Sequence, residues 1–487
     1  MFDVEKSIAK ARGKFNALVQ YVLDRGQRDN AYEVEVELFR SLLALGLLLL
    51  RVWFARKGGS DVGKAVATDA GDVLPRERLK GRRYLTVFGE LRLARWYYHT
   101  DGLPGVFPLD EEANLPERIP SYFVQELTGQ GVAQKTYDET LAGMEKLFAL
   151  RLPKHMLEDL AREMAPDADA YYEALGTPPP ATEAEVLVAA IDGKGVPIVK
   201  DRPAEHKVRL GRGEKRSRKK EAVVTAVYTI EAQPRTPEDI VREVRDKEPP
   251  PRRSKPQNKR LRATLGGKQD AMEWVRGEVA RRDPEGRKRR VCLMDGSKGL
   301  WTMALAVLGA PGFTFILDLF HALEYLWKAA YVFHPEGSVE AEEFVRHRLR
   351  MLLKGNVGRV IGGLRQILTK HGGRLKKSQR KTLAKVIHYY ESNKKWMRYD
   401  EYIAAGYPIG SGAVEGACRH LVKDRMEGSG MRWTIEGAEA VLKLRGVYLN
   451  GDWDAFWHFH MQREAQRRFG DHRWRPLCVP QAAEAAA

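Results

Sequence analysis

The stretch Arg289–Gly309, RRVCLMDGSKGLWTMALAVLG, reads as a buried strand, a turn and a helix in direct succession. Its short apolar run ends at Asp295, and Gly296 follows. A short apolar run bounded by turn residues is typical of a strand that is covered on both faces. The stretch therefore predicts a strand that buries its body and presents a carboxylate at the edge of a sheet, followed by a helix.

The same alternation of strand and helix patterns continues on both sides of this stretch. EVLVAAIDGKG (Glu185–Gly195) predicts a second buried strand that ends at Asp192, and EAVVTAVYTIEAQ (Glu221–Gln233) predicts another strand. Lys268–Arg282 has helical periodicity, and FTFILDLFHALEYLWKAA (Phe313–Ala330) runs from a strand into a helix. Alternating strands and helices predict an α/β core.

The bulk composition points to a polyanionic partner. The 487 residues include 82 Lys and Arg against 65 Asp and Glu, a formal net charge of +17. Such a surplus favours nucleic acid, although a basic enzyme without such a partner has the same balance. Three scattered cysteines without a CxxC pair indicate neither zinc nor disulfides and fit a reducing cytoplasm. The most apolar run, Leu42–Phe54, contains Arg51 and predicts a buried helix rather than a membrane span.

The rest of the chain divides by composition. Tyr84–Thr100 predicts a hairpin, and the proline-rich GTPPPATEAE (Gly176–Glu185) predicts a boundary between domains. We expect six segments: a helical N-terminal region (1–80), a hairpin with helices (81–180), the first part of the core (181–330), a helical insertion (331–404), the return of the core (405–450) and a C-terminal tail (451–487).

Two strand-end carboxylates suggest a metal site. Asp192 and Asp295 are each followed by a glycine, which lets a substrate backbone approach closely. If the two strands are neighbours, these aspartates and a third carboxylate can hold two divalent cations roughly 3.5–4 Å apart. Oxygen ligands suit magnesium or manganese and not zinc, and such a pair of cations serves phosphodiester chemistry.

The third carboxylate is predicted within YPIGSGAVEGACRHLVKDRMEGSGMRW (Tyr407–Trp433). Here a Gly-Ser-Gly turn precedes Glu415 at the start of a helix, which would deliver this side chain to the edge of the sheet. A Glu in this place can also stabilise the N-terminus of its own helix, or pair with Arg419 at i,i+4. The two strand-end aspartates favour the metal-binding interpretation.

Asp318 competes with Asp295 for the role of second metal ligand. It also ends a strand, and His321 lies at i,i+3 from it. The Gly-Ser-Lys-Gly-Leu context after Asp295 favours Asp295. Asp318 and His321 would then be an accessory pair near the nucleic acid, or an ordinary cap between strand and helix.

Basic residues around these acids are candidates for phosphate contacts. Val199–Lys220 contains 10 Lys and Arg against 3 acids, and Pro251–Arg262 contains 6 and no acid; both predict solvated basic loops. Trp433 is a candidate for stacking on an unpaired base, although a core tryptophan has the same sequence pattern. The candidate DNA-binding residues are Arg419, Lys423, Arg425, Arg432, Trp433, Lys215, Arg216, Arg218, Lys219 and Lys220.

The residues carry a family resemblance. The order Asp192, Asp295, distant Glu415 is similar to that of the DDE transposases. MDGSKGL followed by DLFHALEYLWKAA resembles the Mutator-like transposases of bacterial insertion sequences. Tyr407–Trp457 resembles the C-terminal signature of the ISKra group, and RWYYHTDGLPGVFPLD (Arg95–Asp110) resembles its N-terminal region, whose frequent cysteine pairs this chain lacks. The resemblance extends from about residue 84 to 457.

This resemblance implies a ribonuclease-H-like α/β core, a mixed sheet with flanking helices and a helical insertion, behind a mainly helical N-terminal region. It implies a DNA transposase with Asp192, Asp295 and Glu415 as catalytic metal ligands, Mg²⁺ as cofactor and Mn²⁺ as a substitute. The partners would be the element ends, recognised by the first 175 residues, and target DNA, with the chain acting as a homodimer or larger homo-oligomer. A metal-dependent DNA nuclease on the same fold and a catalytically silent DNA-binding protein are the alternatives.

Overall fold

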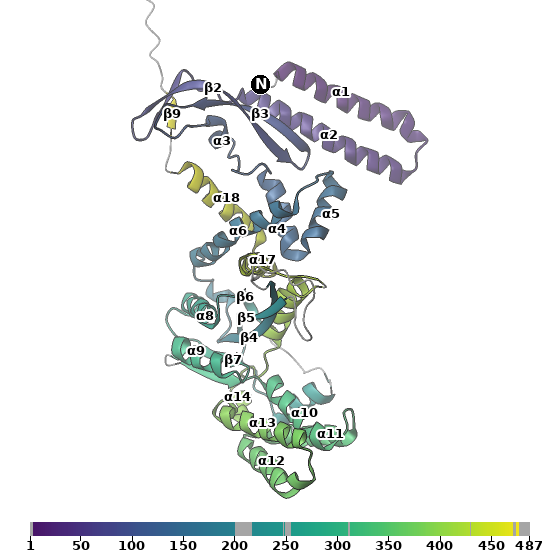
Figure 1. The fold of residues 1–487 in the computed structure, drawn as a ribbon, viewed down its shortest axis with the longest axis vertical. Coiled ribbons are helices and arrows are strands. Elements are labelled where there is room, and N and C mark those ends of the chain that lie inside the picture. The colour runs from purple at the N-terminus through teal and green to yellow at the C-terminus, as the bar shows by residue number, and fades with distance from the viewer. Residues whose placement is uncertain are drawn as a thin grey trace, which may run out of the picture. The chain divides into compact units, whose positions relative to one another are not determined.

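The computed structural model describes residues 3–199, 217–246, 248, 255–309, 312–428, 430–470 and 474–476. Its contacts form two compact units, Met1–Tyr172 with Asp452–Ala487, and Glu173–Gly451. The second unit is a mixed α/β domain and holds all the acidic residues singled out above (Figure 1). The expected α/β class is therefore confirmed.

The sheet of the second unit has five strands in the order β6-β5-β4-β7-β8. β4 pairs antiparallel with β5 and parallel with β7, β5 pairs antiparallel with β6, and β7 pairs parallel with β8. Val186–Ile191 of β4 and Ala222–Thr229 of β5 are buried at every position, because helices cover both faces of the sheet. The strands are β4 (Val186–Val199), β5 (Ser217–Ile230), β6 (Gln257–Thr264), β7 (Arg289–Met294) and β8 (Phe313–Leu317).

Helices follow the strands and then fill the stretch before Glu415. α8 (Lys268–Arg282) has the bounds that its periodicity predicts, and it contacts β5 and β6. The stretch between β8 and Glu415 is helical, as expected. The other helices of this unit are α7 (Pro237–Val241), α9 (Lys298–Leu308), α10 (Leu319–Phe333), α11 (Val339–Leu353), α12 (Val357–His371), α13 (Lys377–Asn393), α14 (Tyr399–Ala404), α15 (Gly412–Ala417), α16 (Asp424–Met426) and α17 (Ile435–Leu449).

Three sequence-based expectations about the sheet are wrong. The basic stretch Val199–Lys220 is not a loop at its two ends, because Val199 ends β4 and Ser217–Lys220 begin β5. The basic stretch Pro251–Arg262 is not a loop from Gln257 onward, because its residues form β6. Leu261 and Ala263 alternate inward with partly exposed arginines, so the basic side chains cover one side of a strand. β4 also does not end at Asp192, since it continues to Val199 as a two-stranded ribbon with β5.

The first unit begins with two helices, α1 (Val4–Leu23) and α2 (Ala31–Lys57), which pack against each other (Figure 1). The expected hairpin follows, with its turn at Val87 and Phe88 directly before Gly89, but its first strand begins before Tyr84. The sheet has the order β3-β2-β1-β9. The elements are β1 (Ala65–Thr68), β2 (Val73–Thr86), β3 (Gly89–Tyr98), α3 (Pro108–Glu112), α4 (Tyr122–Gln134), α5 (Tyr137–Phe148) and α6 (Lys154–Ala174).

The segment that we expected to be a C-terminal tail is part of this first unit. α18 (Trp453–Phe469) contacts α4, and β9 (Trp474–Pro476) pairs with β1. His460 and Arg467 of α18 both hydrogen-bond to the buried Asp167 of α6, which fixes the helix in place. The sequence did not predict this packing, because the buried acid that holds α18 lies almost 300 residues away and leaves no local signal in the sequence.

Within the described residues, α2 is the one helix whose length and composition would allow it to cross a membrane. It packs against α1 and, through Phe54, on the sheet that carries Leu91 and Leu93. The apolar run Leu42–Phe54 is nevertheless not the buried helix that its composition predicts, because α1 and the sheet cover only part of it. In α2, Ser41, Phe54 and Ala55 are buried, whereas Leu42, Leu49 and Trp53 are exposed.

Candidate metal centre

The strand register places three aspartates in one row. The last parallel pair of β4 and β7 is Ile191 with Met294, and the last pair of β7 and β8 is Met294 with Leu317. The next residue on each strand path is an aspartate, Asp192, Asp295 and Asp318. The carboxyl ends of parallel strands meet at one edge of a sheet, so three residues far apart in the chain become neighbours.

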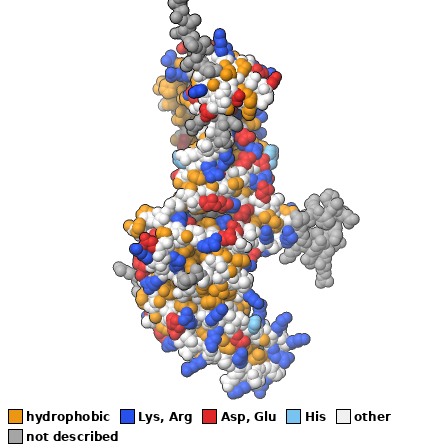
Figure 2. Space-filling view, turned by 90° about the vertical axis from the view of Figure 1, so that its left-hand side faces the viewer, with side chains coloured by type: hydrophobic (Ala, Val, Ile, Leu, Met, Phe, Trp, Pro, Cys, Tyr) orange, Lys and Arg blue, Asp and Glu red, His pale blue; other side chains and the backbone are white. Residues whose placement is uncertain are grey.

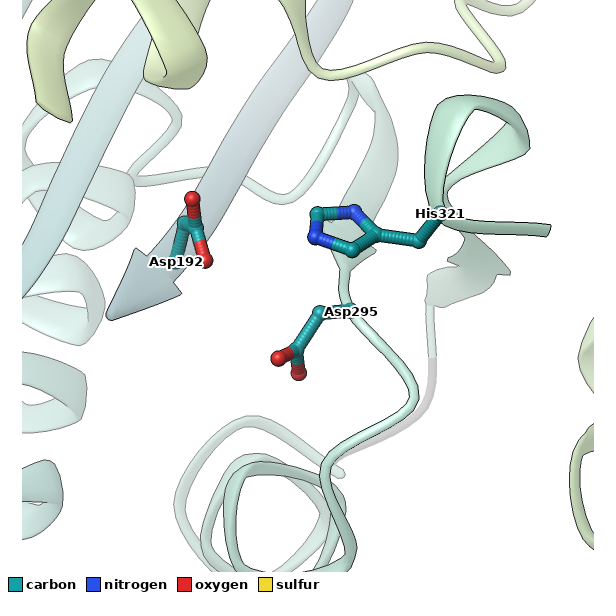
Figure 3. A group of neighbouring side chains, drawn as sticks. All are labelled: Asp192, Asp295 and His321. Atoms are coloured by element: carbon teal, nitrogen blue, oxygen red, sulfur yellow. The ribbon is translucent and has the colours of Figure 1, made fainter. Parts of the chain in front are cut away.

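His321 of α10 joins this row (Figure 3). Ligand atoms of Asp192, Asp295 and His321 all lie within 4.8 Å of one another. Figure 3 shows the imidazole of His321 beside the two aspartates, with one ring nitrogen on the side of Asp192. A second group, Asp318, His321 and Glu415, meets the same limit, so His321 belongs to both groups.

Asp318 is occupied by protein contacts. It is fully buried, and its Oδ2 accepts hydrogen bonds from Ser411 Oγ at 2.7 Å and from His321 Nδ1 at 2.6 Å. Its Oδ1 accepts from the backbone N–H groups of Ser411 at 3.0 Å and Phe320 at 3.2 Å. Four donors leave little capacity for a cation. The geometry therefore favours Asp295 over Asp318 as a metal ligand, and Asp318 both caps α10 and positions its neighbours.

The Asp318 contacts also explain the Gly-Ser-Gly turn. Ser411 is anchored to Asp318, and the carbonyl of Ser411 accepts from the backbone N–H of Glu415 at 2.9 Å at the start of α15. A Cβ at Gly410 would stand 2.7 Å from the ring of Phe320, so only glycine fits there. The turn thus fixes where α15 begins, and this helix brings Glu415 close to the row of aspartates.

The charges of the site are strongly coupled. The hydrogen bond to Asp318, followed by the negative charges of Asp318, Asp192 and Asp295, raises the pKa of His321 to about 9 despite partial burial. His321 is therefore an imidazolium at neutral pH, placed between carboxylates. Loss of solvent raises the pKa of Asp295, against the opposing effects of the Ser297 N–H group and His321.

Glu415 is an exposed side chain near the same charges. Its pKa is raised, first by partial loss of solvent and then by the negative charge of Asp318, while His321 opposes the shift. Among the described residues, Asp192, Asp295 and Glu415 do not form a single group within 4.8 Å. The predicted triad is thus gathered around His321, but it is not closed into one site. A carboxylate-rich donor set of this kind fits magnesium or manganese.

Sequence reasoning missed three residues next to the acids. Cys418, one turn after Glu415, is buried and donates from Sγ to Asp192 Oδ2 at 3.4 Å. Burial and then Asp192 raise the pKa of this thiol.

Tyr389 of α13 packs on Gly296, where a Cβ would stand 2.1 Å from the ring. Glu221 occupies the space beside Gly193 and pairs with Lys268 at 2.8 Å. Only Cys418 had a signal, its i,i+3 spacing from Glu415.

Two of the candidate DNA-binding residues lie in the interior. Arg425 is 2% exposed, and its guanidinium lies 4.9 Å from the ring centroid of Trp433. Trp433 is 7% exposed and donates its indole N–H to the carbonyl of Met426 at 3.1 Å. The prediction that these two contact DNA is therefore corrected: they lie against each other in the interior, and the backbone of Trp433 hydrogen-bonds to Pro197 and Val199 of β4.

The other candidates that the structure describes are accessible. Arg419, Lys423 and Arg432 are exposed, and so are Arg218 and Lys219 of β5, while Lys220 is partly exposed. Lys219 forms an ion pair with Glu427 at 2.6 Å, which joins the β4–β5 ribbon to the end of α16. Cys418–Lys423 adopts a π-helical turn between α15 and α16. Lys215 and Arg216 lie outside the described residues.

No family model and no curated protein matches this chain. The features of the chain that bear on its function are the acidic row, His321, the helix that carries Glu415 and the basic residues beside them.

Proposed function

We propose that this chain is a DNA transposase that cuts the ends of an insertion sequence and joins the 3′ ends to target DNA. One observation carries the proposal. Asp192, Asp295 and Glu415, from three distant parts of the chain, meet around His321 at one edge of the sheet. Their order along the chain is the one that the resemblance to the ISKra group of Mutator-like transposases implies.

The strand arrangement supports a ribonuclease-H-like core. Numbered within this domain, the sheet order is 3-2-1-4-5, with the first three strands antiparallel and the last two parallel to the first. The helices α11 to α14 stand between the last strand and Glu415, where the resemblance places an insertion. Acids on the first and fourth strand paths of such a core are the expected metal ligands.

Asp192, Asp295 and Glu415 would hold Mg²⁺, or Mn²⁺ in its place. Bound cations of this kind activate the attacking oxygen and stabilise the leaving oxygen in phosphodiester chemistry. The protein itself supplies positioning: Asp318 fixes the ring of His321 and the Ser411 turn, so both reach the row of acids. The imidazolium would offset the carboxylate charges and direct Nε2–H toward a phosphate oxygen of the DNA.

DNA would lie along the accessible basic residues beside the acids. Arg419 and Lys423 follow Glu415 on its own helical segment, and Lys219 lies on the adjoining ribbon. Figure 2 shows further Lys and Arg side chains gathered at the lower end of the view, over the helical insertion. A transposase needs one active site for each element end, so a homodimer is the smallest assembly, and the working place would be the cytoplasm.

The test is a strand-transfer assay with the full chain, Mg²⁺, labelled DNA from either side of its own gene and a plasmid target. Joined products are expected from the unchanged chain. Asp192→Asn, Asp295→Asn and Glu415→Gln should each abolish cleavage and joining while DNA binding persists. Glu285→Gln is the matched control, because Glu285 is exposed in the loop before β7.

Other outcomes would replace the proposal. Cleavage without joining would indicate a metal-dependent nuclease. Binding without either reaction would indicate a silent DNA-binding protein. Loss of DNA binding in Glu415→Gln would assign this residue a structural role.

A further inference from the structure

The helical hairpin α1–α2 carries an apolar surface that the described fold leaves uncovered. α2 meets α1 along one side, where Lys14 Nζ of α1 donates to Ser41 Oγ at 3.2 Å. The C-terminal half of α2 meets β3 along a second side, through Leu47, Leu50 and the buried Phe54. A third side of α2 faces neither of these partners.

The uncovered side has the spacing of a helix-packing seam. Tyr32, Phe39, Gly46 and Trp53 recur every seven residues, and Leu42 and Leu49 fall between them at alternate spacings of three and four. The aromatic and leucine side chains of this set are between 45% and 74% exposed. An apolar repeat of 3.5 residues is the pattern by which one helix packs into another. Exposed apolar patches of this extent mark interaction sites.

α1 extends the surface on the same side of the hairpin. Its residues Phe15, Val19 and Val22 are 54%, 43% and 37% exposed. In each helix, the exposed stripe is displaced in the same rotational sense from the residues that face the partner helix, such as Ala11 and Ser41, by about 20–80° in α1 and about 80–180° in α2 at 100° per residue. In an antiparallel pair, positions that are displaced in the same sense flank the same side of the seam, so the two stripes lie on one side of the hairpin.

The glycine in the middle of the α2 stripe does not leave a gap. A Cβ at Gly46 would stand 2.6 Å from the ring of Phe88, which lies at the turn of the β2–β3 hairpin and is itself 38% exposed. Gly46, Leu49, Trp53 and Phe88 line an open groove of about 500 Å³ beside the face. A partner side chain can enter this groove.

We propose that this face, named here the hairpin face (Phe15, Val19, Val22, Tyr32, Phe39, Leu42, Leu49, Trp53 and Phe88), binds the hairpin face of a second copy of this chain as an antiparallel four-helix arrangement. A two-helix layer about 30 Å long and about 20 Å wide offers roughly 600 Å² before side-chain relief is counted, which approaches the ~800 Å² per partner of a stable interface. The inference does not rest on the proposed function.

Charge favours a second copy as the occupant. The tip of the hairpin, residues 20–37, has five acids and two basic residues, whereas residues 3–19 and 40–57 have two acids and eight basic residues. A two-fold axis across the hairpin face would set the acidic tip of one copy against the basic base of the other. A lipid surface offers no such match, because it would meet the acids and the bases on the same side.

The test is the mass of the full chain in solution at micromolar concentration, measured by sedimentation equilibrium. We expect twice 55.2 kDa for the unchanged chain. Leu42→Glu places a charge in the centre of the hairpin face and should weaken dimerisation by about 100-fold or more. Ala44→Glu is the matched control, since it adds the same charge at an exposed position of the same helix outside the hairpin face, and it should leave the dimer intact.

A second measurement does not depend on the variants. Mixed ¹⁴N- and ¹⁵N-labelled chains, treated with a zero-length cross-linker, should give mixed-isotope links between acids at residues 24–37 and lysines at residues 6–14. A monomeric unchanged chain, or a dimer equally stable in Leu42→Glu and Ala44→Glu, would overturn the proposal. Binding to anionic vesicles by the monomer, lost in Leu42→Glu, would assign the hairpin face to a membrane surface instead.

Discussion

Replacing Ser411 by alanine should loosen the helix that carries Glu415. The hydroxyl donates to a carboxylate, Ser411 is 2% exposed and Asp318 is fully buried. A hydrogen bond to a charged group contributes about 1.5–3 kcal/mol, so we expect a loss of about 2 kcal/mol. For a unit of roughly 280 residues this lowers the midpoint of thermal unfolding by about 3–4 °C.

The assay has a thermal, a local and a catalytic readout. Calorimetry of the full chain should show the lower midpoint in the transition of the second unit. Hydrogen exchange should be faster in α15, because its first turn starts from the carbonyl of Ser411. The DNA cleavage rate should fall by about tenfold or more, since small misplacements of a catalytic group are costly. Ser378→Ala, at an exposed position of α13, is the control. The reasoning is refuted if the two variants agree in all three measurements.

Three further outcomes are expected from other parts of the structure. Burial raises the pKa of Asp167, but hydrogen bonds from His460 and Arg467 outweigh this effect and lower the pKa to about 2. The ionised Asp167 therefore stabilises the first unit fully above pH about 4, and this stabilisation fades toward pH 2. In acid-unfolding curves, Asp167→Asn should cost about 2 kcal/mol at pH 7 and much less at pH 2. Gly296→Ala should push against Tyr389 and reduce cleavage, and adding Tyr389→Ala should restore part of it in the same assay; no gain in the double variant would show that the contact is unimportant. DNA affinity should fall steeply with salt, and Arg419→Gln should reduce the slope of log affinity against log salt by about one, whereas an unchanged slope would remove this residue from the interface.

Local patterns predicted the parts of the core that local physics controls. The apolar runs gave the strands before Asp192 and Asp295, because a strand buried on both faces has no polar positions. The periodicity of Lys268–Arg282 gave a helix with the observed bounds. The end of β7 before Asp295 followed from the sequence, whereas β4 continues past Asp192 to Val199, and the register explains why the two carboxylates become neighbours.

The remaining features depend on partners that are distant in the chain. Arg425 and Trp433 look like surface residues in a basic, glycine-rich stretch, but they contact each other in the interior, where Trp433 also hydrogen-bonds to β4. The sequence did not predict the strand β6, because its basic residues dominate its composition and indicate a solvated loop. The role of His321 required the knowledge that Asp318, Asp192 and Asp295 stand in one row, and no spacing along the chain contains that information.

The central claim is that Asp192 and Asp295 hold divalent cations at the edge of this sheet. Binding of Mn²⁺ to the full chain, counted by electron paramagnetic resonance, tests it most directly. The account predicts bound Mn²⁺ in the unchanged chain and in Glu285→Gln, and its loss in Asp192→Asn and in Asp295→Asn. Equal binding in all four proteins would contradict the account.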